Sequence, residues 1–127
     1  MSGQSKATAE HIRKVLQSYV DLMTAGDHEA IVALYADNAT VEDPVGSEPR
    51  RGKEQIRELY RNASGRVRLE LEGRVRVVSN IGAAAMLAYP AGMENMVVDT
   101  IDIMTFDEDG LITSMKAYWS PDTIHPK

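Results

Sequence analysis

The sequence predicts an α+β protein in which helices from the first half of the chain pack on a sheet formed by the second half. Up to about residue 65, apolar residues recur at the spacing of amphipathic helices, whereas beyond it they alternate with polar residues. Helices followed by consecutive antiparallel strands are typical of a layered α+β domain. The chain has no internal repeat or linker, so residues 1–127 are expected to form a single domain.

Three helices are predicted. The first begins after the N-cap residue Thr8 and ends at Gly26, the second begins after Asp27, and the third follows Gly52. Their apolar faces are formed, in chain order, by Ile12, Val15, Leu16, Tyr19, Val20 and Met23, by Ile31, Leu34 and Tyr35, and by Ile56, Leu59 and Tyr60. Each helix is therefore expected to present one tyrosine to the interior.

Five strands are predicted in the second half, at residues 67–72, 75–78, 83–89, 96–106 and 111–119. Residues 107–110 form a compact turn between the last two strands, with Gly110 at a position that favours a positive φ. The two ends of the chain, residues 1–5 and 124–127, are expected to be loose.

Composition excludes several classes of function. The chain has 14 Lys+Arg against 19 Asp+Glu, and this formal net charge of -5 argues against binding to nucleic acids or anionic membranes. It contains no cysteine, which excludes disulfides and thiolate chemistry. No apolar run is long enough to span a bilayer, and the first ten residues lack the apolar core of a signal peptide. We therefore expect a soluble, cytoplasmic protein.

Metal and cofactor chemistry find little support in the sequence. The histidines His11, His28 and His125 are far apart, and none has a carboxylate partner at metal-ligand spacing. There is no Gly-x-Ser-x-Gly motif and no glycine-rich phosphate loop. We expect a site without metal or cofactor.

Two aspartates stand where apolar side chains would be expected. Pro44 restricts Asp43 to an extended conformation, and alternation then places Asp43 on the same side as Val41. If Val41 faces inward, Asp43 does as well; the alternative is that Asp43-Pro44 only opens a turn.

Asp102 belongs to the strand predicted at residues 96–106, on the same face as Thr100 and Met104. The opposite face, which includes Ile101 and Ile103, is also apolar, and this favours a central strand over an edge strand that leaves Asp102 in solvent. A buried, ionised and unpaired Asp102 would cost several kcal/mol, so it should be paired or protonated.

Two interpretations are possible for the tyrosines Tyr19, Tyr35 and Tyr60. Taken singly, each is typical of a core residue whose hydroxyl lies at a solvent-accessible edge of the core. Three that converge would need partners for their hydroxyls, and a chain of phenols that reaches a buried acid would supply them. The residues together suggest an apolar pocket that holds one base, one buried acid and one phenol.

Three segments give the chain a family resemblance. They are Tyr19-Val-x4-Ala-Gly-Asp27, Ile31-Val-Ala-Leu-Tyr-Ala-Asp-Asn-Ala-Thr-Val-Glu-Asp-Pro-Val-Gly-Ser-Glu-Pro49 and Ile101-Asp-x3-Phe106. In this order they resemble the bacterial Δ5-3-ketosteroid isomerases, or steroid delta-isomerases. The resemblance implies a cone-shaped, nuclear-transport-factor-like fold, with three N-terminal helices on a curved and mostly antiparallel sheet. It also implies a homodimer and a cofactor-free enzyme of steroid metabolism.

The resemblance further implies the reaction and its residues. Asp43 matches the general base that moves a proton from C4 to C6 of a 3-oxo-Δ5-steroid, while Tyr19 and a protonated Asp102 match the oxyanion hole. Tyr35 and Tyr60 match tyrosines that extend the hydrogen-bond network of the phenol. The expected substrate pocket comprises Trp119, Val41 and Phe106.

Two alternatives remain open, because one fold can host unrelated functions. The first is another enzyme of the same fold, such as a polyketide cyclase or dehydratase. The second is a non-catalytic module that binds a hydrophobic ligand.

Overall fold

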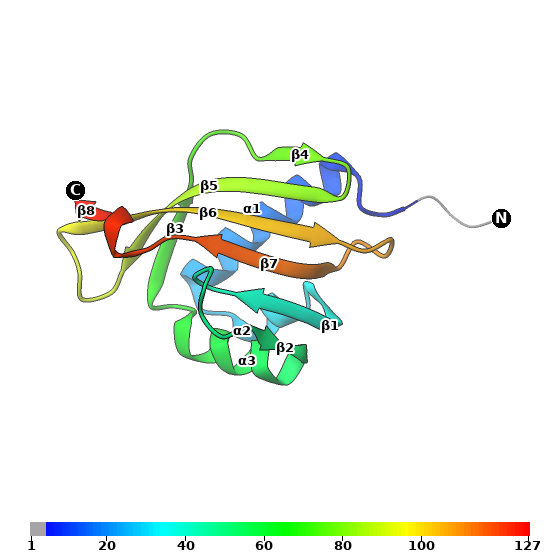
Figure 1. Cartoon of the computed structure of the whole chain (residues 1–127), viewed down its shortest axis with the longest axis horizontal. Helices are drawn as coiled ribbons and strands as arrows, with labels where there is room; N and C mark the ends of the chain where they lie inside the picture. The colour runs from blue at the N-terminus through cyan, green and yellow to red at the C-terminus, as the bar shows by residue number, and fades with distance from the viewer. Residues whose placement is uncertain (1–4) are drawn as a thin grey trace.

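The computed structural model describes residues 5–127, which form an open sheet with helices on one side of it (Figure 1). The helices are α1 (Ala9–Ala25), α2 (His28–Val32), α3 (Gly52–Ala63) and the short 3-10 helix η1 (Pro121–Thr123). The strands are β1 (Tyr35–Glu42), β2 (Arg50–Arg51), β3 (Val67–Leu71), β4 (Arg76–Val78), β5 (Ile81–Pro90), β6 (Met96–Phe106), β7 (Ile112–Tyr118) and β8 (Ile124–Pro126).

The sheet is almost entirely antiparallel. Its strands follow the order β2-β1-β7-β6-β5-β3, with β4 paired to β5 and β8 paired to β6. Among the described strands only β1 and β7 run parallel to each other. Helix α1 crosses behind the sheet, and α2 and α3 lie beside β1 and β2 (Figure 1). The predicted α+β class, with helices packed on a mostly antiparallel sheet, is confirmed. The sheet is not formed by the second half of the chain alone, because β1 and β2 come from the first half.

Helix α1 forms as its sequence signals predict. The hydroxyl of Thr8 accepts a hydrogen bond from the backbone N–H of His11, and Gly26 ends the helix with a φ of 82°. All six residues of its predicted apolar face are buried. The helix approaches the sheet closely at Gly82, where a Cβ would lie 2.6 Å from the side chain of Ile12. Glycine thus lets α1 pack directly against β5.

Helix α2 is shorter than predicted, and Tyr35 does not belong to it. The helix ends at Val32, the chain turns, and Tyr35 is the first residue of β1. Ile31 and Tyr35 are nevertheless fully buried, as the spacing suggested. Two buried side chains four residues apart are compatible with a helix that continues through residue 35. They are equally compatible with a helix that ends and is followed by a strand. Two tyrosines therefore come from helices and one from a strand.

The end of the chain is ordered, contrary to the prediction that residues 124–127 are loose. Strand β8 pairs antiparallel with β6, with Ile124 opposite Val98 and His125 opposite Val97. The side chain of Ile124 packs against the core, and His125 Nε2 lies 3.0 Å from Asp99 Oδ2. The other segment that is expected to be loose, residues 1–5, falls almost wholly outside the described residues.

Strand β6 lies in the middle of the sheet, as predicted from its two apolar faces. It pairs with β5 on one side and with β7 on the other. Its inward face carries Val98, Thr100, Asp102, Met104 and Phe106, all of which are buried. The turn after β6 has Gly110 at a φ of 82°, which also agrees with the sequence. No helix among residues 5–127 combines the length and the apolar character that crossing a membrane requires.

Candidate functional site

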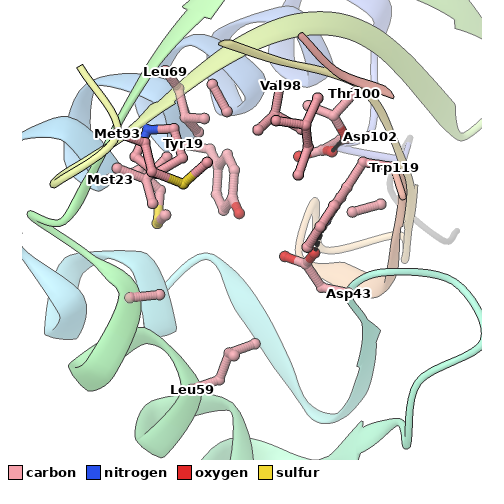
Figure 2. Close-up of a pocket in the computed structure, with 16 residues that line it drawn as sticks. Tyr19, Met23, Asp43, Leu59, Leu69, Met93, Val98, Thr100, Asp102 and Trp119 are labelled. Carbon is pink, nitrogen blue, oxygen red and sulfur yellow. Dashed lines mark hydrogen bonds between the residues drawn. The ribbon is translucent and has the colours of Figure 1, made fainter. Parts of the chain in front are cut away.

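A cavity of about 360 Å³ lies between the helices and the inner face of the sheet (Figure 2). This volume is within the range of small-molecule sites. Most of the wall is apolar and comes from Met23, Leu59, Ala63, Val67, Leu69, Ala88, Pro90, Met93, Val98, Ala117, Trp119 and Ile124. The polar wall residues are Tyr19, Asp43, Thr100 and Asp102. An apolar cavity with a few polar groups is the usual form of a ligand site.

Asp43 enters the cavity from the end of β1. Figure 2 shows its carboxylate directed toward the indole of Trp119, whose Nε1–H donates a hydrogen bond of 2.7 Å to Oδ1. Burial raises the pKa of Asp43, while the indole hydrogen bond and the positive charge of Arg50 oppose that rise. The inward position that alternation predicted for Asp43 is therefore observed, and the aspartate is a candidate base.

Asp102 enters the cavity from the middle of β6 and is 4% exposed. Burial, and then the negative charge of Asp43, raise the pKa of Asp102 to about 7. A hydrogen bond from Thr100 acts in the opposite direction. At or below neutral pH a substantial share of Asp102 is thus a neutral acid, which can donate a hydrogen bond.

The three buried tyrosines form a chain of hydroxyls. The hydroxyl of Tyr60 lies 2.6 Å from that of Tyr35 and 3.2 Å from that of Tyr19. Only Tyr19 lines the cavity, and Figure 2 shows its hydroxyl pointing into it. Burial is the largest cause of a raised pKa in each tyrosine, so all three are neutral phenols at ordinary pH. The predicted chain of phenols is present. Within residues 5–127, however, the Asp102 carboxyl is hydrogen-bonded to Thr100 and not to a tyrosine of this chain.

Two residues expected in the substrate pocket lie elsewhere. Val41 is fully buried and Phe106 nearly so, but both belong to the hydrophobic core and not to the cavity wall. The ring of Phe106 packs edge-on against His11, near the start of α1. Alternation correctly predicts that these side chains face inward, but it does not distinguish the filled part of the interior from the hollow part. Trp119, the third expected pocket residue, does line the cavity.

Sequence reasoning did not identify several residues of the cavity. The sequence pattern puts Thr100 on the same face as Asp102 but indicates no role for it, whereas in the structure its hydroxyl donates a hydrogen bond to that carboxyl. Met93 comes from the β5–β6 connection, and Ile124 from the segment expected to be loose. No periodic pattern reaches these two positions. For Thr100, a hydroxyl two residues before a buried acid on the same face was a usable signal.

The arrangement suits proton abstraction next to a carbonyl. A carboxylate can remove the proton, and a phenol and a neutral acid can donate hydrogen bonds to the oxygen on which negative charge develops. The apolar wall strengthens these interactions because it excludes water. Within residues 5–127, no three His, Asp or Glu side chains gather into a group that could hold a metal ion.

Comparisons with known proteins identify the family. Residues 16–115 match the model of the SnoaL-like domain. The chain is 40% identical to the steroid Delta-isomerase of Nocardioides simplex over 111 residues, which are 87% of this chain and 90% of that protein.

A solved structure supports the fold. It is that of SalBIII, described as an epoxide hydrolase/cyclase-like enzyme in pyran ring formation in polyether salinomycin. The TM-score is 0.83 at 27% identity, and the match covers 94% of this chain and 98% of that one. By sequence and by fold, the chain belongs to the ketosteroid isomerase family, within the SnoaL-like, cone-shaped proteins.

Proposed function

We propose that the protein is a steroid delta-isomerase, which converts 3-oxo-Δ5-steroids into conjugated 3-oxo-Δ4-steroids. The observation that carries this proposal is the presence of Asp43, Tyr19 and Asp102 in the wall of one apolar cavity. The 40% identity to a steroid Delta-isomerase supports the same assignment. An apolar wall suits a hydrocarbon ring system, and the polar groups suit its single reacting ketone.

The reaction needs one base and two donors. The carboxylate of Asp43 removes a proton from C4, and the electrons of the C4–H bond move to give a dienolate. Tyr19 and neutral Asp102 donate hydrogen bonds to the dienolate oxygen, and these bonds strengthen as its charge develops. Asp43 then returns the same proton to C6, so the base is regenerated. One carboxylate serves both carbons because the rigid substrate presents one face to it.

The supporting residues have separate tasks in this proposal. Tyr60 and Tyr35 hold the hydroxyl of Tyr19 in a fixed chain of hydrogen bonds. Trp119 holds the carboxylate of Asp43. Each step moves a proton between the substrate and Asp43, and the substrate is neither oxidised nor reduced overall, so the proposed reaction requires no redox cofactor.

A direct assay tests the proposal. Purified protein is mixed with 5-androstene-3,17-dione, and the absorbance of the conjugated enone is followed. We expect a rate far above the uncatalysed one, and a rate at least ~10²-fold lower in the Asp43→Asn variant. Tight binding of the steroid without turnover would instead indicate a non-catalytic binding protein.

The similarity to SalBIII supports a second candidate, an epoxide hydrolase or cyclase. A neutral Asp102 could protonate an epoxide oxygen while Asp43 activates a hydroxyl nucleophile, so the same two groups would serve. A hydroxy-epoxide probe offered in parallel distinguishes the two reactions. Ring closure of that probe, with no isomerisation of the steroid, would overturn the isomerase assignment.

We also propose that the protein acts as a homodimer, paired through the outer face of the sheet. Ile101 and Tyr118 are neighbours across β6 and β7 on this face and are 47% and 45% exposed. Exposed apolar residues of this size favour an interface. Light scattering coupled to gel filtration tests the pairing, and Ile101→Glu should shift the mass toward the monomer. A monomeric parent protein would refute it.

A further inference from the structure

Thr100 is the polar cavity residue to which the proposed reaction gives no task. It lies two residues before Asp102 on the inner face of β6 and is 8% exposed. Its Oγ1 donates a hydrogen bond of 3.3 Å to Oδ1 of Asp102. Figure 2 shows the two side chains next to each other at the cavity wall, with Val98 on the same strand.

The presence of a hydroxyl group at this buried position requires a structural explanation. Valine has the same shape, and the flanking residues of this face, Val98 and Met104, are apolar. A hydroxyl buried in such surroundings costs free energy unless it is hydrogen-bonded. Among residues 5–127 no buried side-chain polar atom lacks a partner, and the partner of Thr100 is Asp102. The hydroxyl therefore acts on the carboxyl group and not on the packing.

A neutral carboxyl group has two oxygens but only one proton. Its proton can sit on either oxygen, and only one of the two arrangements aims the O–H at a ligand in the cavity. A donor bonded to Oδ1 favours the state in which Oδ1 is the acceptor and Oδ2 carries the proton. The same bond draws electrons from the carboxyl group and makes the remaining O–H a stronger donor.

We propose that Thr100 is a positioning residue for the reaction: its hydroxyl fixes Oδ1 of Asp102 as acceptor, so that Oδ2–H is offered to the dienolate oxygen. This inference rests on the proposed isomerase function. Thr100 itself does not touch the reacting atoms.

The hydrogen bond has a second effect, on the titration of Asp102. It stabilises the ionised form and so lowers the pKa, against burial and the charge of Asp43. Tyr19 from α1 and Tyr35 from β1 couple electrostatically to Asp102, and Tyr60 from α3 couples to Asp43; all three are neutral phenols. The positive charge of Arg50 acts on Asp43. The neighbours of Asp102 in β5 and β7 are Ala84 and Ala117, which do not titrate.

The test compares Thr100→Val with Thr100→Ser. Valine keeps the shape and removes the donor, whereas serine keeps the donor. In Thr100→Val we expect the pKa of Asp102 to rise by roughly one unit, which corresponds to the loss of one hydrogen bond. The alkaline limb of kcat/KM should move up by the same amount. The kcat should fall by roughly tenfold with little change in KM, because the donor is no longer held in one arrangement.

Thr105→Val is the matched control. Thr105 lies on the opposite face of β6, and its hydroxyl bonds to Thr113 and Ser114. The Thr105→Val variant loses both of these hydrogen bonds but should keep the kcat and the pH profile of the parent protein. Thr100→Ser should restore most of both. Thermal unfolding of each variant checks that the fold is retained.

Two measurements separate this inference from the proposed function. Carbon-13 NMR of the Asp102 carboxyl is recorded from pH 5 to 9 on the free protein and needs no turnover, while kcat is measured with 5-androstene-3,17-dione. If the parent protein lacks isomerase activity, the catalytic role fails, and the NMR titration still decides whether Thr100 acts on Asp102. An unchanged titration in Thr100→Val, or a serine variant that behaves like valine, would overturn the inference.

Discussion

The indole N–H of Trp119 donates a hydrogen bond to the carboxylate of Asp43 at 2.7 Å, although the two residues are 76 positions apart in the chain. The contact follows from topology. Strands β1 and β7 are parallel neighbours, with Val41 in register with Met115, so both strands end on the same side of the sheet. Asp43 directly follows β1, and Trp119 directly follows β7. The parallel pair therefore brings the candidate base and its donor together.

Trp119→Phe tests this contact. The ring is retained but the N–H is lost, and a donor that stabilises the carboxylate lowers its pKa. We therefore expect the pKa of Asp43 to rise and the acid limb of kcat/KM to move to higher pH. Tyr89→Phe, in β5 and outside the cavity wall, is the control. Identical pH profiles for Trp119→Phe and the parent protein would mean that the bond does not tune the base.

Asp43→Asn removes the basic lone pair and keeps the size of the side chain. Turnover should fall by at least ~10²-fold, as the loss of a general base normally does. Binding of a saturated 3-oxo-steroid, followed through the fluorescence of Trp119, should persist. Glu42→Gln alters the neighbouring carboxylate, which bonds to the N–H of Gly46, and should leave turnover unchanged. Near-normal activity in Asp43→Asn would show that another group takes the proton.

Tyr19→Phe deletes a donor aimed at the developing oxyanion and keeps the packing of α1. The loss should be roughly 10²-fold to 10³-fold and should appear mainly in kcat. Tyr89→Phe again serves as the control, because Tyr89 does not line the cavity. A change confined to KM would identify Tyr19 as a packing residue only.

The sequence predicts the parts of this molecule that depend on periodicity. The buried face of α1, the central position of β6 and the inward side chains of Asp43 and Asp102 all follow from the spacing of apolar residues. Each of these features depends on which side of an element a residue occupies. Spacing alone is enough to determine that.

Other features depend on contacts between distant segments. Tyr35 is buried as predicted although α2 ends before it, because strand β1 also directs this side chain into the interior. Ile124 is ordered because β8 finds a partner in β6, which no local pattern reveals. Val41 and Phe106 face inward like the cavity residues, but core side chains surround them. The three-dimensional packing of the helices on the sheet determines which part of the interior remains a cavity.

Asp102→Asn and Asp102→Leu test whether Asp102 acts as a neutral donor. An amide replaces a neutral donor, whereas leucine provides none. The asparagine variant should therefore keep much of the activity, and the leucine variant should lose substantially more. The carboxyl carbon of Asp102 should show the protonated chemical shift at pH 5 and titrate near the expected pKa of about 7. An ionised signal throughout pH 5 to 8, or equal damage from both replacements, would exclude the neutral donor.

The same titration predicts how stability depends on pH. Because the pKa of Asp102 is raised from 3.8 to about 7, the native protein keeps a proton that the unfolded chain releases. The free energy of unfolding should therefore fall as the pH rises from about 4 to 7, and level off above that, with a contribution from Asp102 of up to roughly 4 kcal/mol. Asp102→Asn lacks this contribution, so its stability relative to the parent protein should increase over the same interval. Urea unfolding of both proteins at pH 4.5 and pH 8 measures the difference, and a constant gap between them would show that Asp102 is not buried as a neutral acid.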